Sequence, residues 1–170
     1  MDDLINSLER AQKLLKTPDN IEDYISIKIK PIDDGFCCCF HCWPRTWLEI
    51  NDLISPYGHM VDEGDVLIGI KNDIFVLECH ESGPEIIVYL SATAAIASLT
   101  KSVIDIILAI IKNRQKERIG ARFVISKRIT KKGKVIEENI VEIDYPLSKV
   151  NISLLDKKIT AIFKKHTNYH

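Results

Sequence analysis

The sequence predicts an α+β fold in which a long central helix packs on antiparallel β-hairpins, with short helices near both termini. Apolar residues recur at helical spacing near both ends, and three pairs of strand-like segments are each joined by turn residues. Between the second and third pairs, residues 86–111 carry only two charges, Lys101 and Asp105. The expected order α-ββ-α-ββ-α-ββ-α favours antiparallel sheet with helices on one side.

The elements expected in the first half are helices at 3–16 and 44–54 and strands at 24–32, 36–43, 66–70 and 74–79. In the first strand Ile25, Ile27 and Ile29 alternate with polar residues, as in a half-buried strand. Asp33-Asp34-Gly35 supplies the turn of the first hairpin. The acidic residues in 62–65 are expected to be turn residues before the second hairpin.

The long helix is expected over 82–116 because a capping sequence stands at its start. Ser82 can cap the first N–H groups while Glu85 bonds back to the cap, and Pro84 fits the first turn. After Gly120, strands at 122–130 and 135–144 form the third hairpin. Ser153, with Asp156 three residues later, is expected to cap the final helix.

The apolar character of 86–111 leaves two environments open for the long helix. A membrane span is one alternative, but Lys101 and Asp105 would lie within the bilayer at a cost. We favour burial in protein, against the sheet and in a homodimer, since small residues in 91–98 permit close backbone approach. The chain starts with Asp2 and Asp3 and shows no signal peptide, so we expect a cytoplasmic protein.

The net charge of −1 hides an asymmetry between the halves of the chain. Residues 1–85 hold 17 acidic and 7 basic residues, and residues 86–170 hold 7 acidic and 16 basic ones. Mutual neutralisation of the halves is one explanation, and a basic face for nucleic acid or another anion is the alternative. Few aromatics accompany the basic residues, which disfavours nucleic acid. The candidate anion-binding residues are Lys112, Arg114, Lys116, Arg118, Lys127, Arg128, Lys131 and Lys132.

The cysteine-rich run Cys37-Cys38-Cys39-Phe40-His41-Cys42 raises the question of a metal site. Its metal candidates are Cys39 and Cys42, joined by Cys79 and His80 from the second hairpin. A strand places alternate residues about 6.8 Å apart, whereas zinc needs its sulfurs closer together, and one C-x-x-C is a weak signal. We therefore expect the cysteines to serve as small apolar residues in a strand, without metal or other cofactor.

Catalytic motifs are not evident in the sequence. Cys79-His80-Glu81 places a thiol beside an imidazole, but neighbours on a strand point to opposite faces and would not meet. The glycines at 64, 69 and 120 form no phosphate-binding loop. We expect a protein that is not an enzyme.

The run Glu78-Cys79-His80-Glu81-Ser82-Gly83-Pro84-Glu85, with Lys101-Ser102-Val103-Ile104-Asp105 in the following helix, resembles a group of small uncharacterised prokaryotic proteins. The apolar helix, its basic end and the charged hairpin within 78–144 also resemble the effector-associated constant component, a domain that accompanies effectors in bacterial conflict and signalling systems. The resemblance implies a non-catalytic accessory role and carries over no site residue.

These observations predict one α+β domain over 1–170, within which an acidic β-rich half, 1–81, and a basic half, 82–170, can be distinguished. The expected function is protein–protein interaction as an accessory module, with another protein or a second copy as partner. The alternatives are binding of an anionic ligand or nucleic acid through 112–134, and membrane association through 86–111.

Overall fold

A computed structural model of the chain describes residues 3–18, 20–31, 44–55, 58–63, 66–71, 74–79, 83–90, 96–117, 122–144 and 149–167. Its elements are α1 (Asp3–Leu15), a short 3₁₀ turn η1 (Ile21–Asp23), β1 (Tyr24–Pro31), α2 (Pro44–Ile54), β2 (Gly58–Glu63), β3 (Val66–Lys71), β4 (Phe75–Glu78), β5 (Glu85–Tyr89), α3 (Ile96–Glu117), β6 (Phe123–Lys131), β7 (Lys134–Ile143) and α4 (Lys149–Thr167).

The described strands form one seven-stranded sheet in the order β2-β3-β4-β5-β1-β6-β7. Every neighbouring pair is antiparallel. Strand β1 lies between β5 and β6, so a strand from the acidic half hydrogen-bonds to two strands from the basic half. The mixed α+β class with antiparallel sheet is therefore confirmed.

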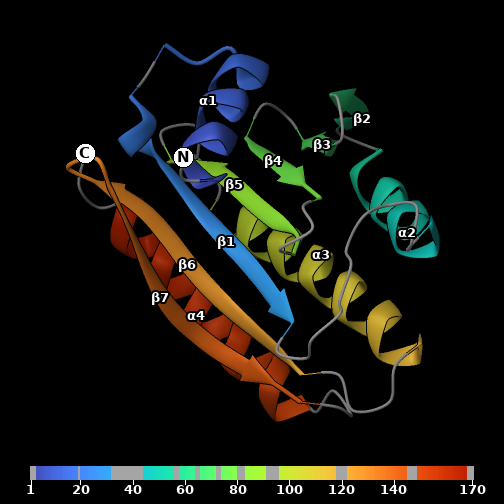
Figure 1. The fold of residues 1–170 in the computed structure, drawn as a ribbon. Helices are drawn as coiled ribbons and strands as arrows, with labels where there is room; N and C mark the ends of the chain where they lie inside the picture. Colours follow the sequence, from blue (N-terminus) through green and yellow to red (C-terminus); the bar gives the residue numbers. More distant parts are fainter. Residues whose placement is uncertain are drawn as a thin grey trace.

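One face of the sheet, here called the helix-layer face, is covered by α2, α3 and α4 (Figure 1). Helix α3 lies between the other two and contacts both. Its buried residues, such as Val103 and Ile107, share a core with Ile27 of β1 and Val88 of β5. Since β-strand side chains alternate between faces, these strands send every second residue into this core.

Helix α1 lies on the opposite face, here called the α1 face. Its buried residues Leu4 and Leu8 form a second core with Ile68 and Val76 of β3 and β4 and Ile87 of β5. The expectation of helices on one side only was wrong, because the inner strands present apolar residues on both faces and each face needs a cover. Helix α1 ends at Leu15, and the next residue, Lys16, has a φ of 52°, which turns the chain as at many helix C-termini.

The helix expected from residue 82 starts only at Ile96. Residues Glu85–Tyr89 instead form β5, which pairs with β4 on one side and β1 on the other. All but Tyr89 are buried, so the strand lacks the alternation by which a half-buried strand is recognised. Hydrogen bonding to the two neighbouring strands β1 and β4 outweighs the local capping signal. The pairing with β1 extends to Pro84, whose backbone carbonyl accepts a hydrogen bond from the backbone N–H of Ile29.

Two other boundaries differ from expectation. Helix α4 begins at Lys149, so Ser153 lies within the helix rather than at its N-cap. The extra helical residues before Ser153 include Ile152, which lines a groove together with Leu108 of α3. The acidic residues in 62–65 were expected to be turn residues, but Asp62 and Glu63 are the last two residues of strand β2. Among the described strands it pairs with β3 alone, at the sheet edge, a position that tolerates polar sequence.

The expected elements at 3–16, 24–32, 44–54, 66–70, 74–79, 122–130 and 135–144 are all present with small shifts at their ends. The cysteine-rich strand expected at 36–43 lies outside the described residues. None of the described helices combines the length and the apolar character needed to cross a membrane.

Candidate functional site

Strand β6 sends two adjacent basic residues to opposite faces of the sheet. Arg128 pairs in register with Ser26 of β1 and lies on the α1 face, whereas Lys127 pairs with Ile27 and lies on the helix-layer face. The two residues therefore belong to separate sites. Arg128 is part of a network of ion pairs on the α1 face, and Lys127 lines a groove on the helix-layer face.

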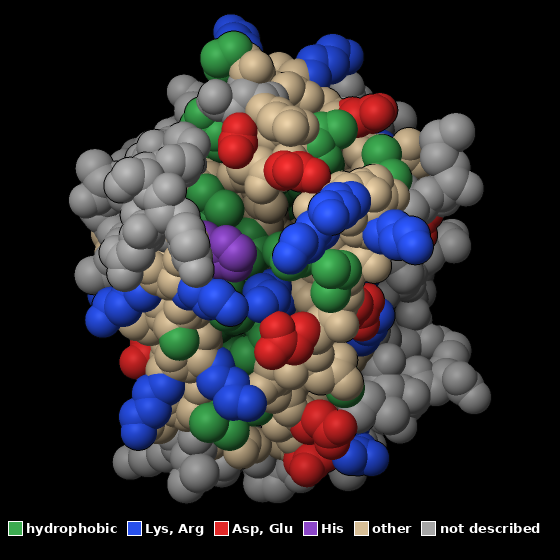
Figure 2. Space-filling view, turned by 90° about the vertical axis from the view of Figure 1, so that its left-hand side faces the viewer, with side chains coloured by type: hydrophobic (Ala, Val, Ile, Leu, Met, Phe, Trp, Pro, Cys, Tyr) green, Lys and Arg blue, Asp and Glu red, His purple; other side chains and the backbone are tan. Residues whose placement is uncertain are grey.

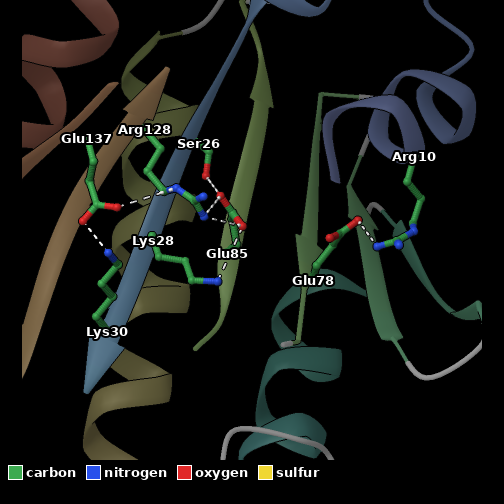
Figure 3. A network of polar contacts seen from close by, with 8 residues as sticks. All are labelled: Arg10, Ser26, Lys28, Lys30, Glu78, Glu85, Arg128 and Glu137. Atoms are coloured by element: carbon green, nitrogen blue, oxygen red, sulfur yellow. Dashed lines mark hydrogen bonds and ion pairs between the residues drawn. The ribbon is translucent and has the colours of Figure 1, made fainter. Parts of the chain in front are cut away.

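The ion network is centred on Glu85, whose side chain is fully buried (Figure 3). Its carboxylate accepts a hydrogen bond from the Ser26 hydroxyl and lies 3.3 and 3.4 Å from Nη1 of Arg128. The Lys28 Nζ lies 3.6 Å away, and this lysine is also buried. A buried carboxylate is therefore surrounded by two cations and a hydroxyl from the neighbouring strands β1 and β6.

Further ion pairs lie in the same row across the sheet, on β7 and on β4. On β7, Glu137 accepts a hydrogen bond from Lys30 and lies 3.8 Å from Nε of Arg128. Burial opposes ionisation of Glu137, but Lys30 and Arg128 together hold its pKa below the ordinary value. On β4, buried Glu78 lies 2.9 Å from Nη1 of Arg10 on α1.

Every carboxylate in this row faces at least one cation from another element. Such mutual pairing fixes the register of the strands that supply it, and it leaves these charges engaged with one another rather than with a ligand. We therefore assign the ion network a structural role.

The groove lies on the other side of β6, between the β6–β7 hairpin and α4. It has a volume of about 280 Å³. On the face shown in Figure 2, blue lysine and arginine side chains gather beside a purple histidine. We call the groove between the β6–β7 hairpin and α4 the lysine groove. Its lining residues are Lys127, Glu138, Asn139, Ile140, Lys158, Ala161, Ile162 and Lys165.

Three lysine ammonium groups and one carboxylate line the lysine groove. The Lys127 Nζ lies 2.8 Å from Glu138 on β7. Contact with Lys127, and at longer range the charges of Lys165 and Lys158, hold the pKa of the Glu138 carboxyl below its ordinary value. Lys158 also donates a hydrogen bond to the carbonyl of Ile140. The groove thus carries an excess of positive charge.

His166 borders the same charges from the end of α4. Burial, followed by the charges of Lys127 and Lys165, lowers the pKa of its imidazole. The Nε2 atom is buried and finds no hydrogen-bond partner among the described residues. The imidazole of His166 is therefore sensitive to the charges of Lys127 and Lys165, although burial is the larger cause of its lowered pKa.

The anion-binding residues expected from the sequence do not share one face. Lys127 lines the lysine groove and Arg128 belongs to the ion network. Lys131 and Lys132 are exposed at the β6–β7 turn, and Lys112 is exposed on α3. Arg114 and Lys116 lie in the last turns of α3 but their side chains are not described, and Arg118 lies outside the described residues.

The metal candidates are likewise not brought together in the part of the chain that the structure describes. Cys79 is buried in the core of the helix-layer face, while Cys39, Cys42 and His80 lie outside the described residues. Among the described side chains, no group of three or more histidine, cysteine, aspartate or glutamate residues is close enough to hold a metal ion.

The contribution of α4 to the groove was not predicted from the sequence. Lys158, Ala161, Ile162 and Lys165 are spaced at three- and four-residue intervals and so lie along one side of a helix. This spacing was visible in the sequence, but its meaning depended on Lys127 of β6 lying opposite.

Comparison with known proteins gives no relative: no family model, no curated protein and no solved structure matches this chain. The resemblance of 78–144 to the effector-associated constant component remains a prediction.

Proposed function

We propose that this chain is a binding module for a small anionic ligand, which it holds in the lysine groove. The observation that carries the proposal is the convergence of Lys127, Lys158 and Lys165 on one groove from two different elements. Ammonium groups so arranged favour a phosphate or carboxylate group, because each can donate to a different oxygen of the anion.

The composition of the groove also limits the ligand. Ile140, Ala161 and Ile162 supply apolar surface beside the charges. The volume of about 280 Å³ is near the lower end of small-molecule sites. These properties suit a compact anion that carries an apolar portion, rather than the repeated backbone of a nucleic acid.

The existing Lys127–Glu138 ion pair gives the groove a means of adjusting to its ligand. Glu138 keeps two thirds of its side-chain surface exposed, so it can move away while Lys127 turns to an incoming anion. An anion that takes the place of Glu138 also contacts two further lysines, Lys158 and Lys165, and these contacts offset the loss of the ion pair.

This proposal differs from the protein-interaction role expected from the sequence, since the charges of the groove favour a small ligand. Binding of an anionic ligand was the first alternative there, placed on 112–134. The groove retains Lys127 from that segment and adds α4.

The proposal is tested by titrating the protein with inorganic pyrophosphate at low ionic strength and measuring heat by calorimetry. We expect Lys158→Gln and Lys165→Gln to weaken binding about tenfold each, the cost of one charge-assisted hydrogen bond. Both side chains are exposed, and circular dichroism of each variant checks that the fold is retained, since Lys158 also donates a hydrogen bond to the Ile140 carbonyl. The matched control is Lys131→Gln, which removes an equal charge at the exposed hairpin turn.

A second readout localises the bound anion. A negative charge in the groove favours the imidazolium form, so pyrophosphate is expected to raise the pKa of His166, measured by NMR titration of its ring. Equal weakening by Lys131→Gln and Lys158→Gln, or an unchanged pKa of His166, would contradict binding in the lysine groove.

A further inference from the structure

Toward the β6–β7 turn, the two strands that border the lysine groove carry a pair of apolar residues. Lys127 pairs in register with Glu138, and two residues further toward the turn Ile129 pairs with Ile136. Because residues two apart on a strand lie on the same face, these isoleucines share the helix-layer face with Lys127. Two residues of a strand span about 6.8 Å, so the two isoleucines, here called the isoleucine pair, lie beside the charges of the groove.

One member of the isoleucine pair is exposed. Ile136 is 45% exposed, whereas Ile129 is half-buried and packs against the core of the helix-layer face. The other exposed residues of β7 are charged or polar, and β7 is an edge strand of the described sheet. Exposed apolar residues on edge strands favour unwanted association, which is why natural edges are mostly charged. Covering Ile136 with a ligand removes this liability.

The lysine groove has apolar surface of its own. Ile162 of α4 lines the groove and packs against the same core as Ile129. Figure 2 shows green apolar side chains directly beside the histidine and the lysines. Beyond the isoleucine pair, exposed Lys131 and Lys134 pair across the strands and end the apolar surface after about another 6.8 Å. The apolar surface is therefore short, and it has lysines at both ends.

The size of this surface limits what can cover it. A protein partner typically buries about 800 Å² of each surface, far more than one pair of isoleucines supplies. A neutral apolar compound would leave the three lysines of the groove unused, and a wholly polar anion would leave Ile136 exposed. A small molecule with an anionic head and a short alkyl tail contacts both surfaces at once.

We propose that the ligand of the lysine groove is a short-chain anionic amphiphile. Its phosphate or carboxylate head lies among Lys127, Lys158 and Lys165, and its alkyl tail lies on the isoleucine pair. This inference rests on the proposed function and specifies the class of ligand that the groove takes. The tail is short because a pair of lysines follows the isoleucine pair directly.

The tail is tested by calorimetric titration with methyl phosphate and hexyl phosphate, which share one headgroup. Affinity for methyl phosphate measures the contribution of the lysines, and the difference between the two compounds measures the contribution of the alkyl chain. We expect hexyl phosphate to bind about tenfold or more tightly than methyl phosphate, because each methylene that leaves water contributes up to about fourfold.

Two variants locate the tail. Ile136→Thr removes apolar surface from the isoleucine pair and keeps a residue that is favourable in strands. We expect it to leave the binding of methyl phosphate unchanged and to reduce the advantage of hexyl phosphate to about threefold or less. The matched control is Leu154→Gln, which should keep the full advantage. Leu154 is 41% exposed and lies one turn before Lys158 on α4, on the side away from Lys165. Circular dichroism checks that both variants fold.

Vesicles that contain phosphatidic acid present the same kind of head and tail from a bilayer. Sedimentation with these vesicles therefore distinguishes a membrane lipid from a free amphiphile. We expect the protein to stay in the supernatant, because the bilayer buries the tail that the isoleucine pair requires. Sedimentation that Ile136→Thr abolishes would overturn the assignment of a free, short-chain ligand.

Equal affinity for methyl phosphate and hexyl phosphate would overturn this inference and leave anion binding in the lysine groove in place. An equal loss of the hexyl advantage in Ile136→Thr and Leu154→Gln would do the same. Failure of pyrophosphate and both alkyl phosphates to bind would contradict the proposed function as well.

Discussion

At the scale of single residues, the direction in which a side chain points decides its role. Lys127 and Arg128 are adjacent and both basic, yet one borders an open groove and the other contacts a buried carboxylate. Both were expected from the sequence to belong to one anion-binding face. Their separation follows from the alternation of a β-strand, which places neighbours on opposite faces of the sheet.

The buried ion network yields a prediction about stability. Glu85→Ala removes the carboxylate that faces Lys28 and Arg128, leaving two buried cations without their common partner. We expect the free energy of unfolding, measured by urea denaturation, to fall by about 3–5 kcal/mol. The conservative Glu85→Gln retains the volume and the contact with Ser26 but also removes the charge, so a substantial part of this loss should remain.

An exposed ion pair provides the comparison. Glu142→Ala breaks an ion pair in which the Glu142 carboxylate lies 3.3 Å from Arg122, and the side chains of both residues are about half exposed. We expect this variant to lower the free energy of unfolding by about 0–1 kcal/mol. A loss at Glu85 no larger than that at Glu142 would show that the buried network does not stabilise the fold.

At the scale of elements, the β3–β4 and β6–β7 hairpins and the starts of α1 and α2 were predicted correctly, whereas the starts of α3 and α4 were not. The β6–β7 hairpin was recognisable because strand-like segments flank Lys131-Lys132-Gly133-Lys134, and its two-residue turn lies at the expected place. By contrast, the capping signal at 82–85 precedes a strand. A capping sequence shows which hydrogen bonds nearby residues can make, but it does not show that the strands β1 and β4 lie on either side of this segment.

The β6–β7 turn gives a prediction at this scale. Lys132 and Gly133 have φ of 52° and 72°, as in the tight turns of hairpins, and a positive φ is costly for lysine. Lys132→Asn should therefore raise the free energy of unfolding by about 1 kcal/mol, since asparagine adopts this conformation more readily. The contact of its backbone N–H with Glu22 is retained. Thermal denaturation measures the change.

Lys131→Asn is the matched control for this turn, because residue 131 is the last of β6 and is not among the residues with positive φ. Asparagine is unfavourable in strands, so this variant should be neutral or slightly less stable. Equal effects at 131 and 132 would contradict the explanation from backbone conformation.

At the scale of the whole molecule, the sheet separates two apolar cores. The larger contains α2, α3 and α4, and the smaller contains α1. Strands β1, β4 and β5 contribute to both: Ile25 and Tyr24, for example, are neighbours in β1 and belong to different cores. Loss of either core therefore exposes one face of the same strands, which should couple their unfolding.

Leu8→Ala tests this coupling. Leu8 is 1% exposed in the α1 core, and its truncation should lower the free energy of unfolding by about 2–5 kcal/mol. We expect a single urea transition, followed in parallel by tryptophan fluorescence and circular dichroism. Leu154→Ala is the control, since Leu154 is 41% exposed on α4 and its truncation should change stability by less than about 0.5 kcal/mol. A separate early transition confined to part of the helical signal would show that the cores unfold independently.

The α+β class, the amphipathic helices α1 and α2, and the hairpins β3–β4 and β6–β7 could be predicted from the sequence, because each depends on periodicity or turn residues within a short segment. Three features could be recognised only in the folded chain: 85–89 is a strand, α1 covers the opposite face, and α4 meets Lys127 to form the lysine groove. The physical reason is that these features depend on partners distant in the chain. A buried strand is defined by its hydrogen-bonded neighbours and a groove by both of its walls.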